Sequence, residues 1–443
     1  MAIRFDPHRY AAELADSESV ASDRQLLYRW QGTHWQAQRD EDSERDAYSW
    51  IVKHDREHAS PGNARMAYNA AALWAPALPV PTETVVIPCR NGYVHVEDGA
   101  LAVAPPAKDL GLQHVIACDF VRGAPGPEFS AFLEQVLPDS GVRARVQEYI
   151  GYTLTADARY HRAQVWLGGG ANGKGVLANI VQALHGSTAA VSLDALEGFR
   201  LSVLIGASLI YCDELPRARI NEQLLKSMIA GERIQVDRKY RDPLSINIRG
   251  KWLVVGNHLP TITDHSLGFW RRLDVVPFDV TIPLERQDPL LASRIRQREL
   301  AGVLNWALDG LVRLQRRGAF DPDMPQAMVK ILQTAKRQTN SVIAWYEDVD
   351  VRPGENVNTP KDAVYQHYHL WCGANGLRPL AAQLFWTRLR DICGVHEERR
   401  RVNDRQLRVC NIELPAHDAA GRDLWRAVAP AAGRRPPRQD LQH

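Results

Sequence analysis

A glycine-rich string ending in a lysine is the stretch of this sequence best suited to chemistry. It follows the apolar run 163–167 and precedes a helical pattern that continues to His185. In a strand–loop–helix unit, glycines let backbone N–H groups turn toward a nucleotide's phosphates, and the lysine reaches the β/γ oxygens. We therefore predict a nucleotide-binding loop. Its predicted contact residues are Gly168, Gly169, Gly170, Ala171, Asn172, Gly173, Lys174, Gly175 and Val176.

Two acids end the next apolar run, about forty residues after the lysine. Asp213 is predicted to hold Mg²⁺ directly or through water, and Glu214 to polarise the attacking water. One position departs from the usual pattern, because Gly175 stands where a Ser or Thr hydroxyl would ligate the metal. The departure leaves the full Mg²⁺ ligand set open.

Three further polar residues accompany the remaining apolar strands. Asn257 follows the run 252–256, where its amide could position the lytic water or sense the γ-phosphate. Arg271 and Arg272 precede the run 274–278. These arginines are either structural or, in an oligomeric ATPase, reach the γ-phosphate of the neighbouring subunit.

Two basic segments are candidates for contact with nucleic-acid phosphates. The alternating pattern 233–243 predicts a β-hairpin that presents Arg238, Lys239 and Arg241. Near the C-terminus, three helical patterns precede the basic run containing Arg399, Arg400 and Arg401, which indicates a winged-helix DNA-binding module. A solvated surface hairpin and a plain helical cap remain the alternatives.

The composition is that of a soluble globular protein. The 443 residues are 45% hydrophobic and carry a net charge of only +2, so any DNA binding must come from local basic clusters. The six cysteines form no CxxC pair, which argues against a zinc module and fits a reducing compartment. Because no signal pattern or membrane-length apolar run is visible, we expect a cytoplasmic protein without a membrane partner.

The pattern of helices, strands and breakers predicts an α/β chain of several domains. Hairpins are expected at 26–36 and 85–96, with a charged helix beginning at an N-cap Ser43 between them. The expected divisions are a mixed α/β domain (1–125), a helical adapter (126–160), the nucleotide-binding core (161–285), a helical region (286–340), the winged-helix-like domain (341–415) and a disordered basic tail (416–443).

With these segments in order, the sequence resembles the superfamily 3 helicases, most closely the primase–helicases of satellite phages and plasmids and the related poxvirus nucleoside triphosphatase. The segments that carry the resemblance are 170–174, Asp213 with Glu214, the segment from Lys226 through the basic hairpin, Asn257 with Pro260, and 270–278. The resemblance implies an AAA+ fold, ATP and Mg²⁺ as ligands, a homo-hexameric ring, and single-stranded or forked DNA threaded through its centre.

The resemblance implies an ATP-dependent DNA helicase that acts in replication of a phage, plasmid or integrated element. Larger relatives carry a primase domain ahead of this region. The first 125 residues of this sequence are too few to form such a domain, and they lack the metal-binding carboxylate motif of a primase. We therefore expect a separate primase and replication initiator as partners. A nucleotide-switched initiator without unwinding activity remains an alternative, as does an RNA helicase or DNA-packaging motor.

Overall fold

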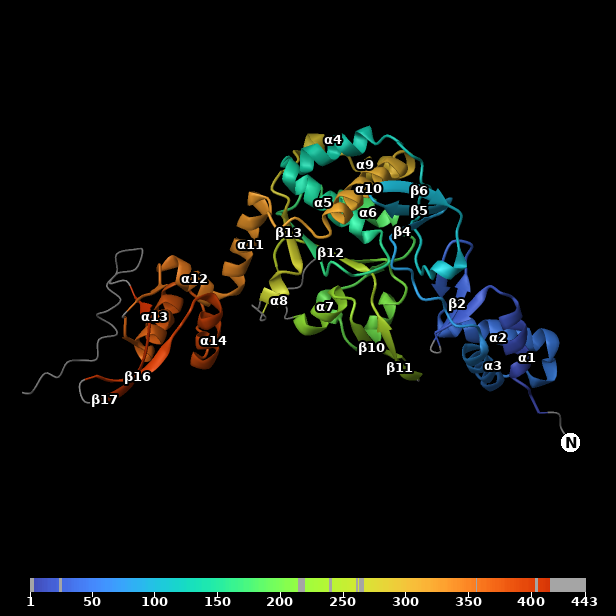
Figure 1. The fold of residues 1–443 in the computed structure, drawn as a ribbon, viewed down its shortest axis with the longest axis horizontal. Coiled ribbons are helices and arrows are strands. Elements are labelled where there is room, and N and C mark those ends of the chain that lie inside the picture. The colour runs from blue at the N-terminus through green and yellow to red at the C-terminus, as the bar shows by residue number, and fades with distance from the viewer. Residues whose placement is uncertain are drawn as a thin grey trace, which may run out of the picture. The chain divides into compact units, whose positions relative to one another are not determined.

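The computed structural model describes residues 4–23, 26–213, 220–238, 241–259, 262, 267–355, 357–402 and 405–414, of which Phe199, Arg241, Leu267, Val402 and Arg405 are described by their backbone alone. These residues form two compact units (Figure 1). The first comprises the chain up to Ile262 together with Gly268–Ile331, and the second comprises the chain from Leu332 onward. The basic tail predicted at 416–443 lies outside the described residues.

The first unit begins with three helices and two small antiparallel sheets. The helices are α1 (His8–Asp16), α2 (Asp40–His54) and α3 (Pro61–Trp74); one sheet is β1 (Val20–Ser22), β2 (Leu27–Trp30) and β3 (Trp35–Ala37), and the other is β4 (Val86–Cys89), β5 (Gly92–Glu97) and β6 (Ala100–Ala104). Both predicted hairpins are confirmed. The N-cap prediction is wrong, because α2 begins at Asp40 and Ser43 is buried within it. Three acids in the first turn favour this earlier start by interacting with the helix dipole.

A five-stranded parallel sheet forms the centre of the first unit. Its order is β13 (Leu273–Pro277), β7 (Ala163–Leu167), β12 (Lys251–Gly256), β9 (Leu209–Asp213) and β8 (Thr188–Ala190). The α/β prediction is therefore confirmed. The strand before Asp213 starts later than the apolar run suggested, because Gly198–Leu204 forms a 3₁₀ helix and Gly206 turns the chain with φ of 74°.

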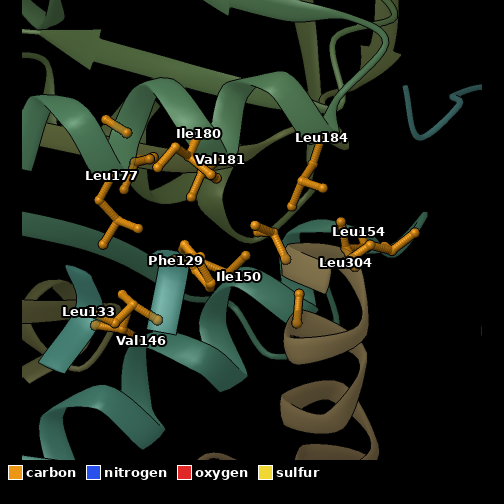
Figure 2. Close-up of a cluster of buried hydrophobic side chains, with 14 of the residues drawn as sticks. Phe129, Leu133, Val146, Ile150, Leu154, Leu177, Ile180, Val181, Leu184 and Leu304 are labelled. Carbon is orange, nitrogen blue, oxygen red and sulfur yellow. The ribbon is translucent and has the colours of Figure 1, made fainter. Parts of the chain in front are cut away.

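Helices cover both faces of this sheet, which explains why its strands read as continuous apolar runs. On one face, Trp166, Leu253 and Val255 join a core with α4 (Pro127–Val136), α5 (Ser140–Thr153), α6 (Lys174–Leu184), α9 (Leu291–Arg298) and α10 (Leu300–Arg317). Figure 2 shows how side chains of α4, α5, α6 and α10 meet there. On the other face, Val165 and Val254 lie beside residues of α7 (Glu222–Ile229) and Phe269 of α8 (Leu267–Trp270).

A separate antiparallel hairpin, β10 (Arg233–Arg238) and β11 (Arg241–Asn247), connects α7 to β12. Helix α11 (Gln326–Thr339) follows α10. The second unit contains α12 (Ser341–Asp348), α13 (Lys361–Ala374), α14 (Ala382–Ile392) and the hairpin of β16 (Glu397–Val402) and β17 (Arg405–Cys410), with the short strands β14 (Arg352–Pro353), β15 (Thr359–Pro360) and β18 (Ile412–Glu413). The predicted sequence of three helices followed by a basic hairpin is confirmed.

Candidate functional site

Three of the predicted site segments meet at one edge of the central sheet. Gly256 pairs with Leu167, and Val255 pairs with Asp213, so β7, β12 and β9 end at the same level. The glycine-rich loop leaves β7 at this edge, and Gly168 donates its backbone N–H to the Gly256 carbonyl at 3.3 Å. Because parallel strands place their carboxyl ends together, residues distant in sequence become neighbours here.

The glycine-rich loop, residues 168–173, has a backbone conformation that requires most of its glycines. Gly170, Ala171 and Gly173 all have positive φ, at 101°, 48° and 81°. Successive turns of this kind point backbone N–H groups into a concavity suited to anions. Among the described residues, no acceptor takes a hydrogen bond from the N–H of Gly169 or Gly170.

Asn172 locks the loop against the neighbouring strand. Its side chain is buried, and its Nδ2 donates to the Phe278 carbonyl at 2.9 Å. A Cβ on Gly168 would lie 2.3 Å from the same carbonyl, so this glycine is needed for close packing. Around Gly169, Gly170 and Gly175 nothing lies within 4 Å of the Cβ position, which leaves this side of the loop open.

Lys174 begins α6 and points into the edge where the strands end. Its Nζ donates to the Gly168 carbonyl at 2.7 Å, to Asn172 Oδ1 at 3.2 Å and to Asn257 Oδ1 at 3.3 Å. Burial lowers the pKa of this ammonium, while the negative charge of Asp213 acts in the opposite direction. The structure thus brings Lys174 and Asn257 into direct contact, with Asp213 close enough to influence the lysine.

Asp213 is exposed at the end of β9, where its carboxylate is accessible to a cation. Asp213 lies close to the Tyr211 hydroxyl, and burial, followed by the negative charge of Asp213, raises the pKa of Tyr211 to about 12. Tyr211 was not a predicted site residue, although its position two residues before Asp213 places both side chains on one face of the strand. Glu214 and Pro260 lie outside the described residues.

Arg271 and Arg272 lie at the opposite edge of the sheet from the glycine-rich loop. They precede β13, whose first residue Leu273 pairs with Ala163 and whose last residue Pro277 pairs with Leu167. Five residues of extended strand, at about 3.3 Å per residue, therefore separate these arginines from the loop edge. Neither arginine is brought to the loop of its own chain.

The β10–β11 hairpin carries one described basic side chain of the three predicted for DNA binding. Arg238 contacts Asp40 at the start of α2, with Nη1–Oδ2 and Nη1–Oδ1 distances of 3.0 and 3.3 Å. Lys239 lies outside the described residues, and Arg241 is described only by its backbone in β11.

The basic hairpin of the second unit exposes all three of its predicted arginines. Arg400 is paired with Glu398 at 2.6 Å. Arg399 lies directly opposite Arg408, and neither of the two forms an ion pair with another described residue. Two like charges facing each other across strands are destabilising unless an anion lies between them. Of the basic residues in this hairpin, Arg399 and Arg408 therefore give the strongest indication of an anion-binding site.

Among the described residues there is no group of three His, Cys, Asp or Glu that could hold a metal ion. The described helices include none with the length and apolarity needed to cross a membrane. The described part of the site at the sheet edge thus contains backbone N–H groups, the Lys174 ammonium, the amides of Asn172 and Asn257, and the Asp213 carboxylate.

Comparison with known proteins finds a family of unknown function and a distant similarity to a putative viral helicase. A family of unknown function, DUF5906, matches residues 166–272, which include the glycine-rich loop, Asp213 and Arg271. The protein of Acanthamoeba polyphaga mimivirus named "Putative helicase L207/L206" is 27% identical over 161 residues, covering 34% of this chain. The chain matches only 17% of the length of that viral protein.

Two solved structures share the fold. The A form apo structure of the NrS-1 C-terminal region has a TM-score of 0.51 at 13% identity and covers 93% of this chain and 100% of its own. The apo structure of NrS-1 residues 305–718 gives a TM-score of 0.51 at 12% identity, with the same coverage. The α/β architecture described above is therefore shared with the NrS-1 C-terminal region over nearly the whole chain.

Proposed function

We propose that this chain is the subunit of an ATP-dependent DNA helicase of superfamily 3 with an AAA+ core. The observation that carries the proposal is the convergence of the glycine-rich loop, Lys174, Asn257 and Asp213 at the carboxyl edge of one parallel sheet. Such edges are where α/β folds bind ligands. The insertion of β12 between β7 and β9 is consistent with an AAA+ core.

The loop fits the triphosphate of ATP. The N–H groups of Gly169 and Gly170, the start of α6 and the Lys174 ammonium provide donors and positive potential for β/γ oxygens. A phosphate oxygen would replace the carbonyl and amide oxygens that hold Lys174 Nζ. Asn257 already accepts a hydrogen bond from that ammonium. Binding or loss of the γ-phosphate would therefore change the position of Asn257 at the end of β12.

The acidic end of β9 fits a magnesium ion. Mg²⁺ prefers carboxylate oxygens and retains several waters, so the exposed Asp213 carboxylate alone would suffice as a protein ligand. Bound there, the ion would neutralise charge on the β/γ-phosphates. Tyr211 would hold Asp213 in position, and Glu214 is proposed to activate the attacking water. Waters would then take the place of the hydroxyl that Gly175 lacks.

The position of Arg271 and Arg272 favours an oligomer. Because five residues of strand separate them from their own loop, they can act on ATP only from a neighbouring subunit. Arg271 is exposed, whereas Arg272 Nη1 donates to the Gly268 carbonyl of its own chain at 2.5 Å. We therefore assign the transition-state arginine to Arg271 and propose a homo-hexameric ring.

DNA would contact both basic hairpins. In the ring, Arg238 and Arg241 of β10–β11, together with Lys239, would track the phosphates of single-stranded DNA through the centre. The second unit, whose three helices and hairpin suit a winged helix, would hold forked DNA through exposed Arg399 and its neighbours Arg400 and Arg401. A separate primase and initiator would complete the replication machinery of a phage, plasmid or integrated element.

The decisive test is ATP turnover and forked-DNA unwinding by the wild type and by Lys174→Ala. Losing the phosphate-binding ammonium should lower turnover by roughly 10²–10³-fold or more, comparable to loss of one preorganised transition-state donor. Lys53→Ala, a charge loss at an exposed residue of α2, is the matched control. Full activity in Lys174→Ala would disprove the proposal, and wild-type binding of ATP without turnover would favour the initiator.

A further inference from the structure

The turn that carries Arg271 is attached to the body of the subunit mainly through its backbone. Arg272 accepts a hydrogen bond from the Ala163 N–H at 2.8 Å, and its own N–H donates to the Phe269 carbonyl at 3.1 Å. These bonds fix the backbone on the β13 side of Arg271. The side chain of Arg271 itself is exposed, as the proposed role in a neighbouring site requires.

Arg162, the residue before β7, also contacts this turn. Its Nη1 donates to the Arg271 carbonyl and lies 3.5 Å from Asp274 Oδ1. One guanidinium therefore bridges the backbone of Arg271 and a carboxylate three residues later. Both contacts come from the same Nη1 atom, whose two N–H groups can serve one acceptor each.

Asp274 is a fixed anchor for this bridge. The carboxylate is completely buried and accepts two hydrogen bonds from Arg145, from Nε at 2.7 Å and from Nη2 at 2.9 Å. Arg145 is also buried, donates to the Asp321 carbonyl at 2.9 Å and lies over the Phe320 ring. Since removing either partner would leave an uncompensated buried charge, this pair holds the Asp274 carboxylate in place.

Arg145 already neutralises Asp274, so Arg162 is not needed to compensate a buried charge. Burial lowers the pKa of Arg162, although the charge of Asp274 raises it, and the side chain stays 25% exposed. What Arg162 adds is the connection between the anchor and the Arg271 carbonyl. Stability alone therefore gives little reason for a guanidinium at this position.

We propose that Arg162 is a positioning residue that aims Arg271 at the nucleotide of the neighbouring subunit. The inference rests on the proposed function, because it assumes ATP hydrolysis between subunits. Without the bridge, the turn can shift relative to β7. A misplacement of about 1 Å can cost on the order of 10²-fold in rate, without changing how the subunit's own loop binds ATP.

The first experiment compares ATP turnover in Arg162→Ala, Arg162→Lys and Arg159→Ala. Arg162→Ala should lower kcat about 10- to 100-fold while KM for ATP changes less than about two-fold. Arg162→Lys should recover part of the loss, because an ammonium can still reach the carbonyl. Arg159→Ala is the matched control, since Arg159 is close in sequence but contacts Asp157 and the Glu83 carbonyl. Wild-type kcat in Arg162→Ala would overturn the positioning role.

The second experiment mixes inactive subunits. Arg162→Ala retains its own glycine-rich loop, and Lys174→Ala retains its arginine turn. Mixed rings should therefore regain ATP turnover at interfaces that combine the two intact halves. Arg162→Ala mixed with Arg271→Ala should gain nothing, because both lack a functional arginine. Recovery of turnover in the Arg162→Ala and Lys174→Ala mixture would exclude misfolding as the cause of the Arg162→Ala defect.

The two proposals fail in different ways. A wild-type protein without ATP turnover would overturn the proposed function, and the positioning role with it. Normal wild-type turnover, combined with an active Arg162→Ala or with no recovery in the Arg162→Ala and Lys174→Ala mixture, would overturn only the positioning role.

Discussion

Two glycines near the end of the loop differ sharply in what surrounds them. Gly173 has φ of 81°, and a Cβ there would lie 2.5 Å from Val136 Cγ1 of α4. Gly175, within the first turn of α6, has open space around its Cβ position and no positive φ. The first glycine is thus required by backbone and packing, and the second is not.

This contrast predicts opposite effects of the same substitution. Gly173→Ala should lower the free energy of unfolding by about 1–2 kcal/mol for the left-handed backbone alone, and weaken ATP binding. Gly175→Ala should be neutral or stabilise by up to about 1 kcal/mol, because alanine favours a helix over glycine. Urea unfolding and ATP titration of both variants check this, and equal losses in the two would contradict it.

At the scale of elements, the β10–β11 hairpin is tied to the N-terminal helices. The Arg238–Asp40 pair is largely buried, with side chains 16% and 18% exposed, and the Tyr68 hydroxyl donates to Asp40 Oδ1 at 2.5 Å. The Asp40 carboxylate occupies Nη1 of Arg238 and offsets the charge of the guanidinium, which weakens its attraction for a DNA phosphate. DNA that uses Arg238 must therefore compete with Asp40 for this guanidinium.

Asp40→Asn should strengthen binding to single-stranded DNA. If the competing pair is worth about 1 kcal/mol, its removal corresponds to roughly a five-fold gain in affinity. Asp46→Asn is the control, because Asp46 lies on the same helix, has the same charge and pairs with Arg29 instead. Fluorescence-anisotropy titrations at one salt concentration compare the two, and equal affinities would show that Arg238 does not contact DNA.

At the scale of the first unit, three buried basic side chains, those of His114, His185 and Lys251, link the end of α5 to the amino edge of the central sheet. His114 Nε2 bonds the Leu154 carbonyl at 2.8 Å, and Lys251 Nζ donates to the Thr155 carbonyl at 2.6 Å. His185 bonds Thr153 and Ser208. Burial, aided by the nearby cations, lowers the pKa of His114 to about 4, of His185 to about 3 and of Lys251 to about 7.

These shifts predict loss of stability in mild acid. Unfolded histidines take up protons below their ordinary pKa of 6.5, whereas the folded ones stay neutral until about pH 4 and 3. Their contribution is complete above pH 6.5 and is lost as the pH falls toward these values. His185→Gln should reduce the pH slope of unfolding free energy near pH 5 by about 1.4 kcal/mol per unit. Identical slopes in the variant and wild type would contradict the assignment.

The sequence by itself determined the local elements and the identity of the reactive groups. Continuous apolar runs predicted the strands of the central sheet, and glycines followed by Lys174 predicted a loop that turns into a helix. These signals are local, because strand burial, helix periodicity and positive-φ positions depend on neighbouring residues. The late start of β9 was missed because an apolar composition does not distinguish a strand from a 3₁₀ helix.

Only the tertiary structure decided which residues meet. The placement of β12 between β7 and β9 puts Asn257 on Lys174, and the pairing of β13 with β7 puts Arg271 at the far edge from the loop. Sequence could not predict the bonds from Arg238 to Asp40 or from Arg162 to Arg271. These two bonds join segments about 110 to 200 residues apart, and the physical reason is that strand order and register fix such contacts through packing of the whole unit.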